Sequence, residues 1–225
     1  MSDAQRFSAA SLMDFVNQAL QRKDVPPDDA QVTAKILVEA DLMGIESHGV
    51  AHLMVHPSYV LGFGQGLVNP RPNIRVMHET PSTALVDGDE GLGPVVGYRA
   101  MGIAIEKAKE CGTGMVAATR SRHYGIAGYY ALMAIPHDMI GLALTNSPPF
   151  VAPTFGRGRM LGTNPIAVAV PTRSGHPFLL DMATSAAAHG KFEIARREDK
   201  PIPPTWGADE EGAPSTDITR IMPRG

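Results

Sequence analysis

Short apolar runs alternate with helical stretches along most of this chain, and this alternation limits its fold more than any other feature. Apolar segments typical of strands cover residues 83–89, 114–120, 139–145, 165–171 and 177–183. Helical stretches are expected at 94–112, 127–135 and 184–197. The alternation predicts an α/β domain. The last two apolar runs are close enough in sequence for antiparallel pairing, so we expect a mixed sheet rather than a doubly wound parallel one.

Two helices are expected to open the chain. Ser8 can cap the first helix, and the second can begin at Asp28 or Asp29 and end at Gly44. Their inward positions, at helical spacing, would be Leu12, Phe15, Val16, Ala19 and Leu20 in the first helix and Val32, Ile36, Leu37, Ala40 and Met43 in the second. A short strand is expected at 73–77. The sequence therefore predicts an N-terminal helical segment over residues 1–75 and an α/β domain over residues 76–225.

Charge and composition exclude several classes of protein. The formal net charge is −3, so the chain has no basic excess for binding nucleic acid. Cys111 is the single cysteine, which excludes an intramolecular disulfide framework and is typical of a reducing compartment. The N-terminus has no apolar core of a signal peptide, and no apolar run reaches the roughly 18 residues of a membrane span. We therefore expect a cytoplasmic protein without nucleic-acid or membrane partners.

The segment 46-ESHGVAHLMVH-56 carries three histidines at four-residue spacing. Two histidines so spaced on a helix can share a zinc ion. Three cannot do so easily, because the outer two would be about 12 Å apart along the axis while zinc–nitrogen bonds are about 2 Å long. The sequence supplies no compact set of further ligands, so no metal is expected. A metal-dependent hydrolase built on His48 and His52 is the less favoured alternative, and packing on a helix face is the plain alternative for His52 and His56.

Two histidines are candidates for proton transfer. His48 lies between Ser47 and Gly49, whose small side chains leave its ring accessible. An unperturbed imidazole titrates near neutral pH, which suits general acid–base chemistry. His123 follows an expected strand, in a turn with Ser121 and Gly125, at the strand end where open α/β sheets hold ligands. A turn histidine that bonds only to the backbone is an equally good interpretation of His123.

Short polar groups also stand at the ends of the later apolar runs. They are Thr145, Asn146 and Ser147; Thr163 and Asn164; and Asp181 with Thr184 or Ser185. Such residues cap turns and helices, and they also bind hydroxyl and amide groups of ligands. The glycines of 91-GLGPVVG-97 are interrupted by Pro94, so a Rossmann phosphate loop is not expected.

Five motifs in order resemble one known family. They are SHGV at 47–50, SRHYGIAGYY at 121–130, LTNSPP at 144–149, LGTNPIAVAVP at 161–171 and LDMATSAAAHGK at 180–191. From about Phe7 to Trp206 the chain is similar to the malate/L-lactate dehydrogenase family, whose fold is not the Rossmann one. That family includes ureidoglycolate, sulfolactate and diketogulonate oxidoreductases and a cyclic-imine reductase.

The resemblance implies an α/β, mixed-sheet, non-Rossmann NAD(P)-binding fold and a homodimer. It implies hydride transfer between NAD or NADP and a small 2-hydroxy or 2-keto acid. His48 or His123 would move the proton, an assignment that stays open, and Asp181 would support it by orienting the histidine. Ser47 and His52 would lie beside the substrate. The cofactor would contact Ser121, His123, Gly125, Thr145, Asn146, Ser147, Thr163, Asn164, Asp181, Met182, Ala183 and Thr184.

The chain departs from the family in two respects. The family usually has an arginine where this chain has His52, and a neutral imidazole cannot form the charged, forked contact of a guanidinium. The four-residue spacing of the three histidines would then result from this replacement, and His56 would be incidental to the site. The chain also stops at 220-RIMPRG-225, before a lysine–glycine segment of the family, so the domain over 76–225 is expected to be incomplete. A truncated, inactive remnant that only binds or associates is therefore the main alternative.

Overall fold

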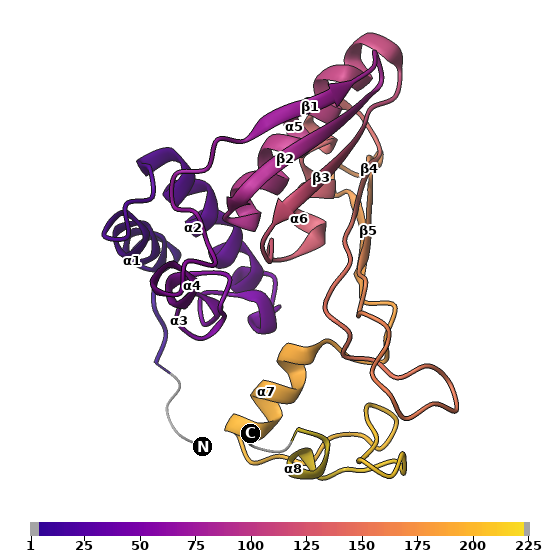
Figure 1. The fold of residues 1–225 in the computed structure, drawn as a ribbon. Helices are drawn as coiled ribbons and strands as arrows, with labels where there is room; N and C mark the ends of the chain where they lie inside the picture. Colours follow the sequence, from indigo (N-terminus) through magenta and orange to yellow (C-terminus); the bar gives the residue numbers. More distant parts are fainter. Residues whose placement is uncertain (1–4, 223–225) are drawn as a thin grey trace.

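The computed structural model describes residues 5–222 and contains two small sheets with helices packed around them (Figure 1). The N-terminal part is helical and is followed by the first sheet, the second sheet and a C-terminal irregular region. The elements are α1 (Ala9–Gln21), α2 (Pro27–Leu42), η1 (Glu46–His48), α3 (His52–Val55), α4 (Val60–Gly64), β1 (Arg75–Glu79), β2 (Thr83–Gly91), α5 (Gly93–Cys111), β3 (Met115–Ser121), α6 (Ala127–Leu132), η2 (Ile135–His137), β4 (Gly141–Leu144), β5 (Ile166–Val170), β6 (Phe178–Met182), α7 (His189–Arg197) and α8 (Ile218–Ile221).

The six strands form two sheets of three strands each. The first has the order β1-β2-β3, with β1 antiparallel and β3 parallel to β2. Parallel neighbours need a crossover connection, and α5 supplies it. The second sheet, β4-β5-β6, is antiparallel throughout. The expected α/β class with mixed strand pairing is confirmed, although the strands divide between two sheets.

The first helices form close to where the sequence predicts, although α2 begins at Pro27, one residue before the expected start, and ends at Leu42, before Gly44. Ser8 is the N-cap of α1, and its Oγ accepts a hydrogen bond from the backbone N–H of Ser11 at 3.1 Å. Pro27 opens α2, a position where the missing N–H of proline costs nothing. Gly112 ends α5 in the left-handed conformation, with φ of 77°, which glycine adopts without strain.

Two hydrophobic clusters form the core, and α2 contributes to both. Leu37 of α2 lies in the first cluster with residues of α1 and α5, and Tyr59 is buried there too. Ile36 of α2 lies in the second, beneath α6 and the second sheet. Because Val95 of α5 belongs to the first cluster, the core crosses the domain boundary predicted at residue 75. That division stays a prediction.

Small residues let α6 pack closely on the second sheet. Gly141 and Ala143 of β4 are buried beneath α6, as are Ala167 and Ala169 of β5. A side chain at Gly141 would collide with the backbone carbonyl of Ala131 in α6. Alternate residues point away from α6, and the opposite face therefore exposes large apolar side chains. They include Leu142, Leu144, Phe178 and Met182.

Several finer expectations are wrong. Phe15 is 53% exposed, because α1 buries only Val16 and Leu20, and Met43 is exposed because it lies just beyond the end of α2. The run at 114–120 is not a buried strand, because β3 is the edge strand of its sheet and its residues are mostly exposed. The helix expected at 127–135 ends at Leu132 and is followed by the 3-10 turn of η2. Within residues 5–222, no helix is both long and apolar enough to cross a membrane.

The helix expected from residue 184 begins only at His189. Thr184 and Ser185 do not cap it. The Thr184 hydroxyl donates to the carbonyls of Thr163 and Asn164, each at 3.1 Å, and the Ser185 hydroxyl donates to the carbonyl of Ala187. These bonds hold the chain in a loop, because they tie the residues after β6 to the residues before β5.

Candidate active site

The Ser-His-Gly segment leaves the end of α2 in a tight bend. The carboxylate of Asp41, near the end of α2, accepts a hydrogen bond from the backbone N–H of Val50 at 2.9 Å. A side chain at Gly49 would collide with this carboxylate, so a larger residue here would displace Asp41 and its bond to Val50. His48 therefore lies in η1, and His52 begins the separate helix α3. The histidines do not share one straight helix.

The bend and the β3–α6 loop bring four imidazole rings together. The ring centroids of His48 and His52 are 5.6 Å apart, and those of His52 and His56 are 5.1 Å apart. The ring of His123 lies 5.4, 5.1 and 4.7 Å from the rings of His48, His52 and His56. We call these four residues the imidazole cluster. The ring of His56 is the one nearest to His123, so His56 belongs to the imidazole cluster, and the expectation that it is incidental stays a prediction.

Two neighbouring hydroxyls hold rings of the imidazole cluster. The Ser47 Oγ lies 3.0 Å from Nδ1 of His48. The buried hydroxyl of Tyr59 lies 3.2 Å from Nδ1 of His123. The same nitrogen faces the backbone N–H of Gly125 at 3.3 Å, and Gly125 has φ of +82°, which favours glycine. The turn before α6 thus presents His123 to the other rings.

Burial keeps the imidazole cluster neutral near neutral pH. Burial, and then the neighbouring imidazoles, lower the pKa of both His48 and His52 to about 4. The pKa of His56 is also lowered by burial, and that of His123 lies well below its ordinary value for the same reason. A neutral imidazole has a free electron pair, so these rings are bases rather than cations.

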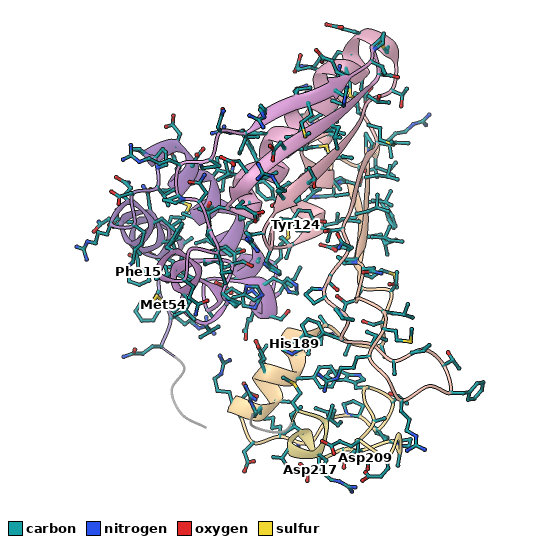
Figure 2. The ribbon with its side chains drawn as sticks, viewed as in Figure 1. Phe15, Met54, Tyr124, His189, Asp209 and Asp217 are labelled. Carbon is teal, nitrogen blue, oxygen red and sulfur yellow. The ribbon has the colours of Figure 1, made fainter. Side chains whose placement is uncertain are left out.

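Helix α7 packs against η1, next to the imidazole cluster, and adds two polar side chains, His189 and Glu193. Gly190 packs on Ser47 so closely that a Cβ there would lie 2.8 Å from the Cβ of Ser47. The Glu193 carboxylate lies 3.5 Å from Nδ1 of His189, and its charge raises the pKa values of histidines in the cluster. Figure 2 shows His189 at the end of α7 that faces the N-terminal helices. Sequence reasoning missed His189 and Glu193. Their four-residue spacing is the signal that could have indicated that they share one face of a helix.

Hydrogen bonds join three loops at one end of the strands of the second sheet. Ser147, after β4, accepts the backbone N–H of Thr163 at 2.7 Å through its Oγ. The side-chain oxygen of Asn164, before β5, accepts the backbone N–H of Ser147 at 3.1 Å. The backbone N–H of Thr184, after β6, donates to the carbonyl of Thr163 at 2.9 Å. Four of the predicted cofactor residues therefore lie together, and we call them the polar loop group.

Asp181 links β6 to the start of α6. It pairs with Ala167 in the sheet, and its Oδ2 accepts the backbone N–H of Gly128 at 2.7 Å. Burial raises the pKa of this carboxyl, and the bond from Gly128 partly opposes the rise. Within residues 5–222 no hydrogen bond joins Asp181 to a histidine, so the expected direct orientation of a histidine by Asp181 is absent from this geometry.

The remaining predicted residues flank these groups. Ser121 ends β3 and its hydroxyl donates to the carbonyl of Arg122, while the Thr145 hydroxyl donates to the carbonyl of Asn146. Met182 is exposed at the end of β6, and Ala183 follows it. Across the described residues, no group of three or more His, Cys, Asp or Glu side chains is arranged to hold a metal ion. The geometry therefore gives no support to the metal-dependent alternative.

Comparison with known proteins agrees with the motifs. The family model described as malate/L-lactate dehydrogenase matches residues 7–225. A malate dehydrogenase from Pyrococcus horikoshii is 54% identical over 214 residues, which make up 95% of this chain and 58% of the relative. The chain belongs to the malate/L-lactate dehydrogenase family. The resemblance found in the sequence is confirmed.

Two further members show the breadth of the family and the agreement in fold. An L-sulfolactate dehydrogenase from Methanocaldococcus jannaschii is 46% identical over 92% of this chain and 59% of the relative. The solved structure of the Pyrococcus horikoshii malate dehydrogenase matches with a TM-score of 0.85 and 51% identity, over 96% of this chain and 57% of that one. This member of the family thus spans less than two thirds of each of these relatives.

Proposed function

We propose that this chain carries the acid–base and cofactor-binding residues of an NAD- or NADP-dependent 2-hydroxy acid dehydrogenase. The observation that carries the proposal is the imidazole cluster, which places a neutral His48 next to a neutral His123. A 2-hydroxy acid must lose a hydroxyl proton during oxidation, and a neutral imidazole within reach has the free electron pair that can accept it. Family membership supports this reading over a structural role for the four rings.

The polar loop group has the chemistry to hold a nicotinamide cofactor. Hydroxyls and amides of Ser147, Thr163, Asn164 and Thr184 can bond to ribose hydroxyls and phosphate oxygens. Gly162 lets these loops pack closely, because a Cβ there would collide with the side chain of Asn164 and the backbone of Ser147. The buried hydroxyl of Tyr124 has no partner among the described residues, and Figure 2 shows Tyr124 beside α6. These features fit the cofactor.

The residues of the site would have different roles in the reaction. His48, held by Ser47, would accept the hydroxyl proton, with His123 as the alternative acceptor. Asp181 would act as a positioning residue, because its bond to Gly128 fixes the start of α6. We also retain as cofactor contacts Ser121 and Gly125, at and after the end of β3, and Thr145, Asn146, Met182 and Ala183, at the ends of β4 and β6. When bound, the nicotinamide supplies the acceptor or donor of the hydride.

The proposed substrate class, compartment and oligomeric state are taken from the family. We propose malate-like and sulfolactate-like 2-hydroxy acids as substrates, since the relatives that match are named for them. We further propose a cytoplasmic homodimer, which light scattering on the purified protein tests directly. NAD and NADP are both retained, because no residue of the polar loop group selects between them.

A direct assay tests the proposal. The purified chain is mixed with L-malate, L-sulfolactate or L-lactate and with NAD⁺ or NADP⁺, and absorbance of the reduced nicotinamide is followed. We expect turnover that falls at least about a hundredfold in the variant that lacks the true base, His48→Asn or His123→Asn. A chain that binds NADH but turns over none of these acids would favour the alternative of an inactive remnant.

A further inference from the structure

The Nδ1 nitrogen of His123 faces two hydrogen-bond donors of the chain itself. The backbone N–H of Gly125 donates to it at 3.3 Å, and the hydroxyl oxygen of Tyr59 lies 3.2 Å from it. A backbone N–H can donate a hydrogen bond but cannot accept one. A nitrogen that accepts this bond must hold a free electron pair. Nδ1 of His123 therefore carries no proton in this geometry.

The absence of a proton on Nδ1 fixes where the proton of the His123 ring lies. A neutral imidazole without a proton on Nδ1 carries it on Nε2. An imidazolium has an N–H on both nitrogens, so the bond from Gly125 also disfavours the charged ring. Within residues 5–222, no hydrogen bond involves Nε2 of His123. The Nε2–H group is thus the donor that His123 can offer to a ligand.

Tyr59 supports this tautomer from the core. Its side chain is fully buried in the first hydrophobic cluster, and burial raises the pKa of its hydroxyl, which therefore keeps its proton. The same hydroxyl lies 3.4 Å from the carbonyl oxygen of His123. If it donated only to that carbonyl, Nδ1 would need a proton to bond to Tyr59, and this proton would then face the N–H of Gly125. Because two donors facing each other repel, donation from Tyr59 to Nδ1 is the favoured arrangement.

His48 has no such restriction. Its Nδ1 lies 3.0 Å from the Oγ of Ser47, and a serine hydroxyl can either donate or accept. Within residues 5–222, no backbone N–H donates to the ring of His48. His48 can therefore present either a free electron pair or an N–H at its other nitrogen, whereas His123 presents only an N–H. The two stacked rings, with centroids 5.4 Å apart, are thus suited to different tasks.

We propose that Tyr59 and the backbone N–H of Gly125 are positioning groups that hold His123 as its Nε2–H tautomer, so that His123 donates a hydrogen bond to the reacting oxygen of the substrate and His48 accepts the hydroxyl proton. The inference rests on the proposed function and deepens it, because it decides between the two histidines. During oxidation the hydroxyl proton passes to His48, the hydrogen on the same carbon leaves as hydride to the nicotinamide, and His123 keeps its proton. A neutral imidazole donor stabilises the negative charge that develops on the oxygen without giving up its own proton.

Nuclear magnetic resonance of the ring nitrogens tests the tautomer directly. The full chain is isotope-labelled in its histidine nitrogens, and spectra that correlate these nitrogens with the ring C–H protons are recorded at neutral pH. Protonated and unprotonated ring nitrogens resonate at well-separated frequencies, and the signals of His123 are those that disappear in His123→Gln. We expect Nδ1 of His123 to be unprotonated and Nε2 to be protonated. A His123 ring with its proton on Nδ1, or shared evenly between the two nitrogens, would overturn the inference.

Tyr59→Phe removes only the hydroxyl and so measures its part. The ratio of the Nδ1–H form to the Nε2–H form of His123 should rise by about tenfold, because one hydrogen bond to Nδ1 is lost. Tyr98→Phe is the matched control, since Tyr98 of α5 is 41% exposed and its hydroxyl forms no hydrogen bond within residues 5–222. It should leave the spectrum of His123 unchanged. A Tyr59→Phe spectrum identical to that of the wild type would refute the role of Tyr59, and the wild-type spectrum decides the tautomer whether or not this variant folds.

Turnover of L-malate tests the two roles. Glutamine carries an N–H donor but no nitrogen that accepts a proton, so His123→Gln should keep turnover within about tenfold of the wild type. His48→Gln, the matched change, should lose at least about a hundredfold, because the base is gone. A hundredfold loss in His123→Gln, or an active His48→Gln, would overturn the inference.

The spectra need neither cofactor nor turnover, so they separate failure of this inference from failure of the proposed function. A folded, inactive chain with the Nε2–H tautomer would refute the proposed function and leave the positioning of His123 by Tyr59 and Gly125 in place. An active chain whose His123 carries its proton on Nδ1 would refute the inference alone.

Discussion

At the scale of single residues, two neighbouring histidines have opposite surroundings. His48 has a hydroxyl partner at 3.0 Å, whereas the Nδ1 of His52 is buried and has no hydrogen-bond partner within residues 5–222. The motif was enough to select His48 and His123 from the sequence. It could not indicate that His56 also joins them, because that depends on the short α3 and on the extended backbone of His56 that ends it. Convergence of side chains from three segments is a property of packing.

The buried histidines predict loss of stability in mild acid. Their pKa values in the folded chain lie below the value of about 6.5 for a free side chain, so the unfolded chain binds more protons below that pH. The contribution of these neutral histidines to the free energy of unfolding should therefore be fully present above about pH 6.5. It should fall, by on the order of 2 kcal/mol or more, as pH drops toward about 5. Urea unfolding across this range measures it. A His56→Asn variant with an unchanged slope would contradict the role of the cluster.

Asp181 predicts a difference between two substitutions. Asp181→Ala removes the acceptor of the Gly128 N–H and should cost about 1–3 kcal/mol of the free energy of unfolding. Asp181→Asn keeps an oxygen at the same place and removes a charge whose burial is unfavourable, so it should cost less. Urea unfolding at neutral pH compares the two. Equal losses would show that the bond to Gly128 is unimportant for folding.

At the scale of elements, the second sheet shows what an apolar run does and does not predict. The runs at 139–145, 165–171 and 177–183 become β4, β5 and β6, as expected from their composition. The sequence of these runs could not show which face of the sheet α6 covers, because the residues on both faces are apolar. The covered face is chosen by size: glycine and alanine let α6 approach, while leucine and phenylalanine point away.

Helix α7 gives a prediction about two glycines. Gly190→Ala forces a Cβ against Ser47, so α7 should shift away from η1, with a loss of about 1–3 kcal/mol in stability and several-fold weaker malate binding. Gly102→Ala in α5 is the matched control, since a Cβ there meets nothing within 4 Å. It should stabilise the chain by about 0.5–1 kcal/mol. Unfolding in urea and calorimetry report both effects, and equal behaviour of the two variants would refute the packing of α7 on Ser47.

At the scale of the whole molecule, sequence reasoning predicted the class, the order of elements and the family, and it missed the arrangement. The alternation of apolar and helical segments, and capping residues such as Ser8 and Gly112, act locally, so the sequence alone predicts their effect. The division of the strands into two sheets and the shared core built on α2 depend on long-range packing. The polar loop group was predicted residue by residue from motifs, but its hydrogen bonds needed the fold.

The measurement that tests the central claim most directly is a fluorescence titration of the purified chain with NADH, alongside the Ser147→Ala and Thr163→Val variants. The account predicts saturable binding that weakens by about tenfold or more in each variant, because their hydroxyls belong to the polar loop group. Folded protein that shows no saturable binding, or binding that both variants leave unchanged, would contradict the assignment of this site to a nicotinamide cofactor.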